Sequence, residues 1–348
     1  MRIAACMLLA AARLAAQSGP FAMTEPMREQ VRRVTTLQSG SQAKVRALLQ
    51  YTFLPVESGG LGMQYDNSRT RTVQEAWEDR KANCITLTAY FVVACRSLGL
   101  EVGFAESPGI SNWRKSGALI RHERHMVAIL DQRPMGVAVM DFLPELRKGF
   151  YVVDPITEDR ALALWHSNRA VEAMEQGDEA TALAEATRAV NLPGAGGTGW
   201  NTLGVVLREN KDLEGAIKAF RKALDLDPRE GAACGNLEAI YRELGEQELA
   251  DRYRAQALKL RAKDPYFHAF LAREAMEGGD LAKAEKELDQ AIKLMEREPE
   301  FFVLRAQLCM LAGRNEKAVK ALEQAKKWAS PEERNRMDRK LAKIRNEA

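Results

Sequence analysis

Three residues in the first half of the chain, Cys84, His125 and Asp141, have the types that nucleophilic catalysis by a thiol requires. A thiol becomes a strong nucleophile when a neighbouring base takes its proton, and a carboxylate can hold that base in the right orientation. An imidazole base must come from the four histidines of the chain, which are His122, His125, His166 and His268. The elements that position these groups decide whether the three residues form a site.

Cys84 opens a segment with helical periodicity. The apolar face that it shares continues through Leu87, Thr88, Phe91, Val92, Cys95 and Leu98. Gly99 is expected to end the helix. At the helix N-terminus, free backbone N–H groups, the helix dipole and nearby cations stabilise a thiolate. Cys95 lacks these donors and is predicted to be a packing residue, and the same role is the alternative for Cys84.

The segments HMVAIL (125–130) and VAVMDF (137–142) are apolar runs separated by DQRPMG. They predict two antiparallel strands joined by a turn. If the turn is centred near Arg133, residues whose numbers add to about 266 lie opposite each other, at Cβ separations of roughly 5 Å. This register sets Asp141 against His125, so that Asp141 could orient the ring and His125 could take the thiol proton. The alternative is a structural His–Asp pair at a strand end.

Two other residues compete for these roles. His122 is a rival base in the charged segment RHERH, which is predicted to be a loop. Asp154 in YVVDP is a rival acid, although it follows a separate strand-like run and has no simple pairing with His125. The sequence leaves the choice between Asp141 and Asp154 open.

The remaining segments predict an α+β domain over residues 25–157. Residues 25–50 have a helical pattern, and the glycine-rich segment 57–70 is predicted to be a loop. A short helix is expected within TVQEAWEDRKANC (72–84), and a strand in EVGFAES (101–107).

The second half of the chain is repetitive. Two alanine columns recur every 34 residues, at Ala182, Ala216, Ala250, Ala284 and Ala318, and at Ala189, Ala223, Ala257, Ala291 and Ala325. Small residues at a fixed period predict paired helices that approach closely. Residues 199–228 resemble the tetratricopeptide repeat (TPR) through Trp200, Leu203, Gly204, Ala216, Phe220, Ala223 and Pro228. We expect an all-α solenoid of five TPR-like repeats over residues 158–332 and a capping helix over 333–348.

The first half also resembles a known family. Residues 83–107, NCITLTAYFVVACRSLGLEVGFAES, resemble the cysteine-helix segment of the transglutaminase-like superfamily, and the order Cys84, His125, Asp141 is similar to that of its triad. The family's usual aromatic residue after the histidine is replaced by Met126. The resemblance implies a papain-like α+β core and acyl transfer through a thioester on Cys84, with water or an amine as acceptor. It also implies an oxyanion hole that includes the backbone N–H of Cys84, and it implies no metal or organic cofactor.

The composition and the N-terminal segment limit the binding partners and the cellular location that can be expected. The net charge of +3 is nearly balanced and gives no nucleic-acid signature. The five cysteines are widely spaced and form no pattern typical of disulfides or metal sites.

Residues 1–24 resemble a signal peptide, or a lipoprotein box around Cys6, which predicts export to the periplasm or envelope of a bacterium. An amphipathic helix on a cytoplasmic protein is the alternative. No stretch is long and apolar enough to be a convincing transmembrane helix.

Two hypotheses of function follow. The first is a thiol-dependent acyl-transfer enzyme, a cysteine peptidase, amidase or transglutaminase, whose repeats bind a protein or peptide. The second is a catalytically inactive transglutaminase-like domain that acts with the repeats as a protein-binding scaffold.

Overall fold

The computed structural model describes residues 19–342, apart from 117–118, 132–136, 143–152, 229, 263–264, 330–333, 335–336 and 340. Residues 1–18 of the predicted export segment 1–24 lie outside the described residues. The chain divides into two compact units, Met1–Gln247 and Glu248–Ala348, and each is considered by itself. No helix of the described residues is long and apolar enough to cross a membrane.

The described part of the first unit contains two helices, α2 (Glu25–Thr35) and α3 (Ser41–Phe53), where the sequence predicted one over 25–50. That prediction is wrong because Gly40, which precedes α3, has a φ of 84°. Such a backbone conformation interrupts a right-handed helix and is most easily adopted by glycine. The helical pattern therefore continues across the break although the helix does not.

The predicted loop 57–70 contains regular structure. Val56–Ser58 forms a 3-10 turn, and β1 (Gln64–Tyr65) pairs in parallel with β2 (Lys81–Ala82). Between these strands lies α4 (Val73–Asp79), the predicted short helix, which starts with a capping box formed by Thr72 and Glu75. The helix α5 (Cys84–Ser97) follows and begins at Cys84, as the sequence predicted.

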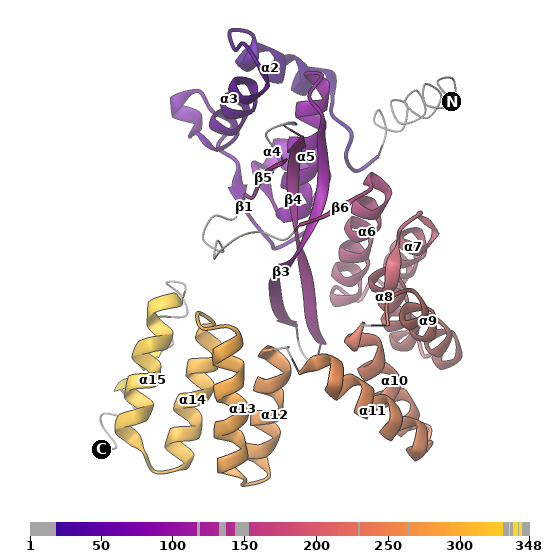
Figure 1. Cartoon of the computed structure of the whole chain (residues 1–348), viewed down its shortest axis with the longest axis vertical. Helices are drawn as coiled ribbons and strands as arrows, with labels where there is room; N and C mark the ends of the chain where they lie inside the picture. The colour runs from indigo at the N-terminus through magenta and orange to yellow at the C-terminus, as the bar shows by residue number, and fades with distance from the viewer. Residues whose placement is uncertain are drawn as a thin grey trace. The chain divides into compact units, whose positions relative to one another are not determined.

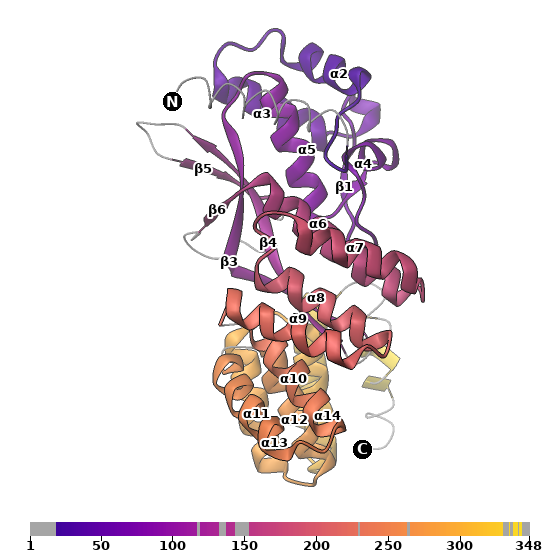
Figure 2. The ribbon, with the colours of Figure 1, turned by 90° about the vertical axis from the view of Figure 1, so that its right-hand side faces the viewer.

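A four-stranded antiparallel sheet packs against α5 (Figures 1 and 2). Its strands are β3 (Val102–Ser116), β4 (Leu119–Asp131), β5 (Val137–Met140) and β6 (Asp154–Ile156), in the order β5-β4-β3-β6. The predicted pairing of β4 with β5 is confirmed.

The longer hairpin of β3 and β4 was not predicted. The segment SPGIS suggests a loop because it contains proline and glycine, but the register of the hairpin shifts between Ser107 and Ser111 and pairing then resumes. A β-bulge accommodates residues that a regular ladder does not.

The core of this α/β part lies between α5 and the sheet. Tyr90 and Phe91 of α5 and Phe104 and Met126 of the sheet are at most 1% exposed. Phe21 stacks on Phe104 with ring centroids 5.8 Å apart. Residues ahead of position 25 therefore pack into the domain that the sequence predicted to begin there.

Ten helices follow in the described residues, two for each of the five expected repeats. Those in the first unit are α6 (Glu158–Glu175), α7 (Glu179–Asn191), α8 (Gly196–Glu209), α9 (Leu213–Leu226) and α10 (Gly231–Glu243). The others are α11 (Gln247–Arg261), α12 (Pro265–Glu277), α13 (Leu281–Leu294), α14 (Pro299–Leu311) and α15 (Asn315–Trp328). All ten alanines of the two repeating columns are at most 3% exposed, so they lie where neighbouring helices meet.

The predicted capping helix over 333–348 falls only partly on described residues. Met337 and Leu341 are buried and share a hydrophobic cluster with Leu322 of α15. Lys326 of α15 also pairs with Asp338 at 2.6 Å. The described part of this segment thus covers the last repeat.

One glycine of the array is predicted to be sensitive to a single methyl group. A Cβ added at Gly204 of α8 would lie 2.5 Å from the ring of Phe220 in α9, which is fully buried. We expect Gly204→Ala to lower the free energy of unfolding by about 1–3 kcal/mol, because overpacking forces the helices apart. Urea denaturation measures this change. Gly278→Ala is the control, since its Cβ would meet nothing closer than 3.4 Å, and equal losses in both variants would contradict the packing argument.

Candidate active site

Cys84 is the first residue of α5 and is partly buried. Asn83 caps the helix, and its side-chain oxygen accepts a hydrogen bond from the N–H of Thr86 at 3.0 Å. The N–H groups of Cys84 and Ile85 belong to the first turn, where a helix has no internal acceptor to offer them. Cys84 therefore sits at the positive end of the helix dipole.

His125 and Asp141 are in direct contact. Nε2 of His125 lies 2.7 Å from Oδ1 of Asp141, and the two side chains are 2% and 1% exposed. They come from β4 and from the residue directly after β5.

The predicted register that suggested this contact is wrong by two residues. β4 pairs Ala128 with Met140, so the register continued by one residue sets Asp141 opposite Val127. The contact between His125 and Asp141 is instead diagonal across the hairpin. Neighbours two residues apart in register share a face of the sheet and lie within reach of a long or aromatic side chain.

The imidazole of His125 joins the other two groups. Burial by itself would lower the pKa of His125, but hydrogen bonds to Asp141 and to the sulfur of Cys84, with the negative charge of both partners, raise it to about 9. Because Nε2 faces Asp141, Nδ1 is the ring nitrogen left for the thiol. The arrangement thus favours a protonated imidazole beside the Asp141 carboxylate at neutral pH.

One hydrogen bond fixes the distance between α5 and β4 beside this site. The hydroxyl of Thr88, one turn after Cys84, donates to the backbone carbonyl of Met126, which directly follows His125, at 3.1 Å. Both Thr88 and Met126 are fully buried. Cys84 and His125 are therefore held by adjacent, tightly packed backbone segments.

The structure also places the two rival residues. Asp154 is exposed and lies in β6, at the opposite edge of the sheet from β5. His122 lies in β4, where its backbone pairs with Trp113, and not in the predicted loop. The carboxylate that contacts His125 is that of Asp141.

Sequence reasoning missed the residues that hold the start of α5. Nδ2 of Asn83 donates to the hydroxyl of Thr70 at 2.9 Å, and the hydroxyl of Thr86 donates to the carbonyl of Arg71 at 2.6 Å. Arg71 in turn pairs with Asp66 and Asp79, each at 2.8 Å. An Asn directly before an apolar run is an N-cap signal that could have identified Asn83, whereas no sequence pattern links residues 70 and 83.

The remaining histidines have structural partners inside the repeats. Nδ1 of His166 lies 2.6 Å from Glu185, and Nδ1 of His268 lies 2.7 Å from Glu287. The two pairs occupy the same position in different repeats, and each joins the two helices of one repeat. Within the described residues no group of three His, Cys, Asp or Glu side chains could hold a metal ion.

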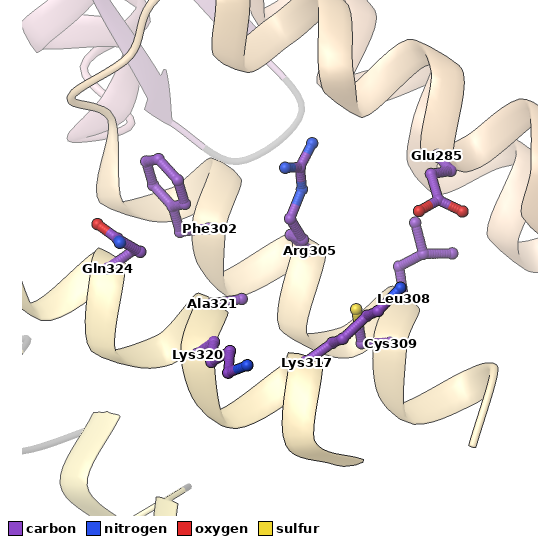
Figure 3. A pocket seen from close by; sticks show the side chains of 9 residues that line it. All are labelled: Glu285, Phe302, Arg305, Leu308, Cys309, Lys317, Lys320, Ala321 and Gln324. Carbon is purple, nitrogen blue, oxygen red and sulfur yellow. The ribbon is translucent and has the colours of Figure 1, made fainter. Parts of the chain in front are cut away.

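A separate pocket of about 330 Å³ lies within the second unit, between α13, α14 and α15 (Figure 3). Phe302, Arg305 and Leu308 of α14 line it together with Lys317 and Lys320 of α15. The remaining lining residues are Glu285, Cys309, Ala321 and Gln324. The cavity therefore combines an apolar surface with three cationic side chains.

Comparison with protein families identifies the repeats. Models of the tetratricopeptide repeat match residues 197–230, which contain α8 and α9, and residues 271–331, which extend from within α12 through α15. The chain contains tetratricopeptide repeats, and its C-terminal region is an all-helical solenoid of them, as the sequence predicted. No curated protein matches the chain.

Several solved structures are similar to the chain. A thermophilic TPR protein from Thermus thermophilus has 19% identity and a TM-score of 0.38, over 52% of this chain and 98% of that one. PilF of Pseudomonas aeruginosa has 16% identity and a TM-score of 0.39, over 54% of this chain and 86% of its own. A tetratricopeptide repeat protein from Parabacteroides merdae has 16% identity and a TM-score of 0.37, over 52% and 70%.

The contact between His125 and Asp141 predicts a specific dependence of stability on pH. Because the pKa of His125 is raised from 6.5 to about 9 in the folded state, its pairing stabilises the fold fully below about pH 6.5. That stabilisation is lost as the pH rises through about 9. We expect the free energy of unfolding of the wild type to exceed that of Asp141→Asn by a few kcal/mol near pH 6, and by much less near pH 9.5.

Urea denaturation at the two pH values measures the difference. Asp154→Asn removes an exposed carboxylate at the other edge of the sheet, so it should match the wild type at both values. A loss in Asp141→Asn that is the same at both pH values would contradict the ionic pairing.

Proposed function

We propose that the protein is a thiol-dependent acyl-transfer enzyme that uses Cys84 as nucleophile, His125 as acid and base, and Asp141 as the group that orients the imidazole. The observation that carries this proposal is the buried 2.7 Å contact of His125 in β4 with Asp141 after β5, together with the effect of Cys84, the first residue of α5, on the pKa of the same imidazole. A buried carboxylate and imidazole are costly to bring out of water, and this cost is offset by their contact.

The proposed reaction follows from these positions. The Cys84 thiolate attacks the carbonyl carbon of an amide, and the carbonyl oxygen becomes an oxyanion near the free N–H groups at the start of α5. The imidazolium of His125 gives its proton to the leaving amine as the C–N bond breaks, which leaves a thioester on Sγ. Water or an amine then attacks the thioester and gives a proton to His125, and the carbon–sulfur bond breaks to restore the thiolate.

The arrangement of the elements supports the transglutaminase-like assignment of the α/β part. A helix that begins at the cysteine packs against an antiparallel sheet whose neighbouring strands carry the histidine and lead to the aspartate. This is the order that the sequence resemblance implied. We therefore propose that residues 19–157 form a transglutaminase-like domain.

The reactivity of Cys84 tests this proposal. We expect iodoacetamide to label Cys84 readily below pH 7 in the wild type, and at least about tenfold more slowly there in His125→Ala, because the imidazolium no longer stabilises the thiolate. Peptide mass spectrometry against pH measures the rate. Cys95 is the internal control, since burial raises its pKa to about 12.

The scaffold hypothesis predicts a different pH dependence of Cys84 labelling. In an inactive domain Cys84 would be labelled along an ordinary thiol titration near pH 8.5, and His125→Ala would leave that titration unchanged. The repeats would then carry the whole function.

We propose that the repeats bind a peptide, with the pocket in the second unit as one contact. Tetratricopeptide repeats generally bind proteins or peptides. Lys317 and Lys320 are exposed beside the apolar side chains of Phe302 and Leu308, so the pocket suits an apolar side chain flanked by carboxylates. The expected ligand is thus an acidic peptide segment that contains leucine or a similar residue.

Fluorescence anisotropy with a labelled peptide of alternating glutamate and leucine tests the pocket. We expect the double substitution Lys317→Glu and Lys320→Glu to weaken binding about tenfold or more, because like charges then face each other. Lys218→Glu with Lys222→Glu in α9 is the control, since neither residue lines the pocket. Equal weakening in both double variants would show that the peptide responds only to net charge.

A further inference from the structure

The first repeat helix reaches the segment that holds the start of α5. Glu172 and Trp165 lie in α6, and both make hydrogen bonds to residues 70 and 71. We propose that Glu172 and Trp165 are positioning residues for Cys84, so that the repeat array fixes the nucleophile. This inference rests on the proposed function, because it concerns how the thiolate of that function is held.

The first connection starts at Glu172. Its Oε1 accepts a hydrogen bond from the backbone N–H of Thr70 at 2.6 Å. The hydroxyl of Thr70 accepts a hydrogen bond from Nδ2 of Asn83 at 2.9 Å, and Oδ1 of Asn83 accepts from the N–H of Thr86 at 3.0 Å. Three successive hydrogen bonds therefore lead from the first repeat to the cap of the helix that begins at Cys84.

The second connection starts at Trp165. Its indole Nε1 donates to the backbone carbonyl of Arg71 at 2.8 Å, and the same carbonyl accepts from the hydroxyl of Thr86 at 2.6 Å. Trp165 is 6% exposed and Thr86 is fully buried. A carbonyl oxygen has two lone pairs, so these two donors use its full capacity and fix the carbonyl between α6 and α5.

Both connections end in the first turn of α5, on the two sides of Cys84. Asn83 precedes the cysteine and Thr86 follows it by two residues. Buried polar groups that lose a partner rearrange to recover one, since an unpaired buried group is costly. Such a rearrangement would turn Asn83 or the first turn of α5, and a shift of about 1 Å between nucleophile and base can cost about 100-fold in rate.

The packing of α6 shows why the first repeat can exert this effect. Ala161, Leu164 and Trp165 belong to the same hydrophobic core as α5 and the sheet. Arg160, near the start of α6, also pairs with the buried Glu106 of β3 at 2.8 Å. The helix is therefore part of the α/β core, and it cannot move without disturbing the segment that caps α5.

Conservative variants separate positioning from stability. Glu172→Met removes the acceptor while keeping the length of the side chain, and Trp165→Phe removes the indole donor while keeping an aromatic ring. Glu172→Gln keeps one acceptor oxygen for the N–H of Thr70. Glu179→Met, at an exposed position in the first turn of α7, is the matched control.

The experiment is the pH profile of iodoacetamide labelling of Cys84 in the full chain. We expect Glu172→Met and Trp165→Phe to label about tenfold more slowly than wild type near pH 6, with profiles shifted toward that of an ordinary thiol. Glu172→Gln should retain most of the wild-type rate, and Glu179→Met all of it. A near-ultraviolet circular dichroism spectrum of each variant establishes that it is folded, and Trp165→Phe serves alone if Glu172→Met does not fold.

The failures are distinguishable. If the wild type itself is not labelled below pH 7, the proposed thiolate chemistry is wrong. If the wild type is labelled there and the folded variants keep its profile, with only their unfolding midpoints lowered, Glu172 and Trp165 are structural and the positioning role is overturned.

Discussion

The start of α5 is buried, so its polar groups must find hydrogen-bond partners inside the protein. The arrangement of the α/β part depends on this requirement. Asn83, Thr86 and Thr88 are at most 2% exposed, so each of their polar groups needs a partner inside the protein. These partners are Thr70, the carbonyl of Arg71 and the carbonyl of Met126. Satisfying one helix end therefore fixes the segment before α4, the strand β4 and the helix α5 relative to one another.

The candidate site is a consequence of that arrangement. Because α5 is tied to the backbone beside His125, the thiol at its first residue lies next to the imidazole. Asp141 completes the group from the neighbouring strand end, through a diagonal contact that the register permits. The raised pKa of His125 follows from its interactions with Asp141 and Cys84 and not from burial, which acts in the opposite direction.

The helix α6 is part of both the first repeat and the α/β core. It forms the first repeat together with α7, and it also contributes Trp165 to the core of the α/β part. The first unit accordingly contains both the α/β part and the first repeats. A boundary drawn at residue 158 marks where the helix begins, but the packing continues across it. The first repeat therefore contacts the part of the chain that holds Cys84. The pocket between α13, α14 and α15 lies in the other unit.

Elements with local sequence signals could be predicted before the structure was known. The 34-residue period gave the paired repeat helices, because small residues must recur wherever helices cross closely. The apolar face that starts at Cys84 predicted α5, and two apolar runs predicted the pairing of β4 with β5. Local patterns also gave two wrong predictions, one at the helix break at Gly40 and one at the bulge after Ser107. Both features depend on local backbone conformations, which a periodic pattern of apolar residues does not reveal.

Contacts between distant residues depend on how the elements pack and could not be predicted from the sequence. The register of β4 and β5, and hence the diagonal contact of His125 with Asp141, depends on the turn geometry and the packing of both strands against the core. The choice of Asp141 over Asp154 depends on which edge of the sheet each strand occupies. The contacts of Glu172 and Trp165 with residues 70 and 71 join positions about a hundred residues apart. Such pairings are set by the joint burial of several elements, and no short segment of sequence encodes them.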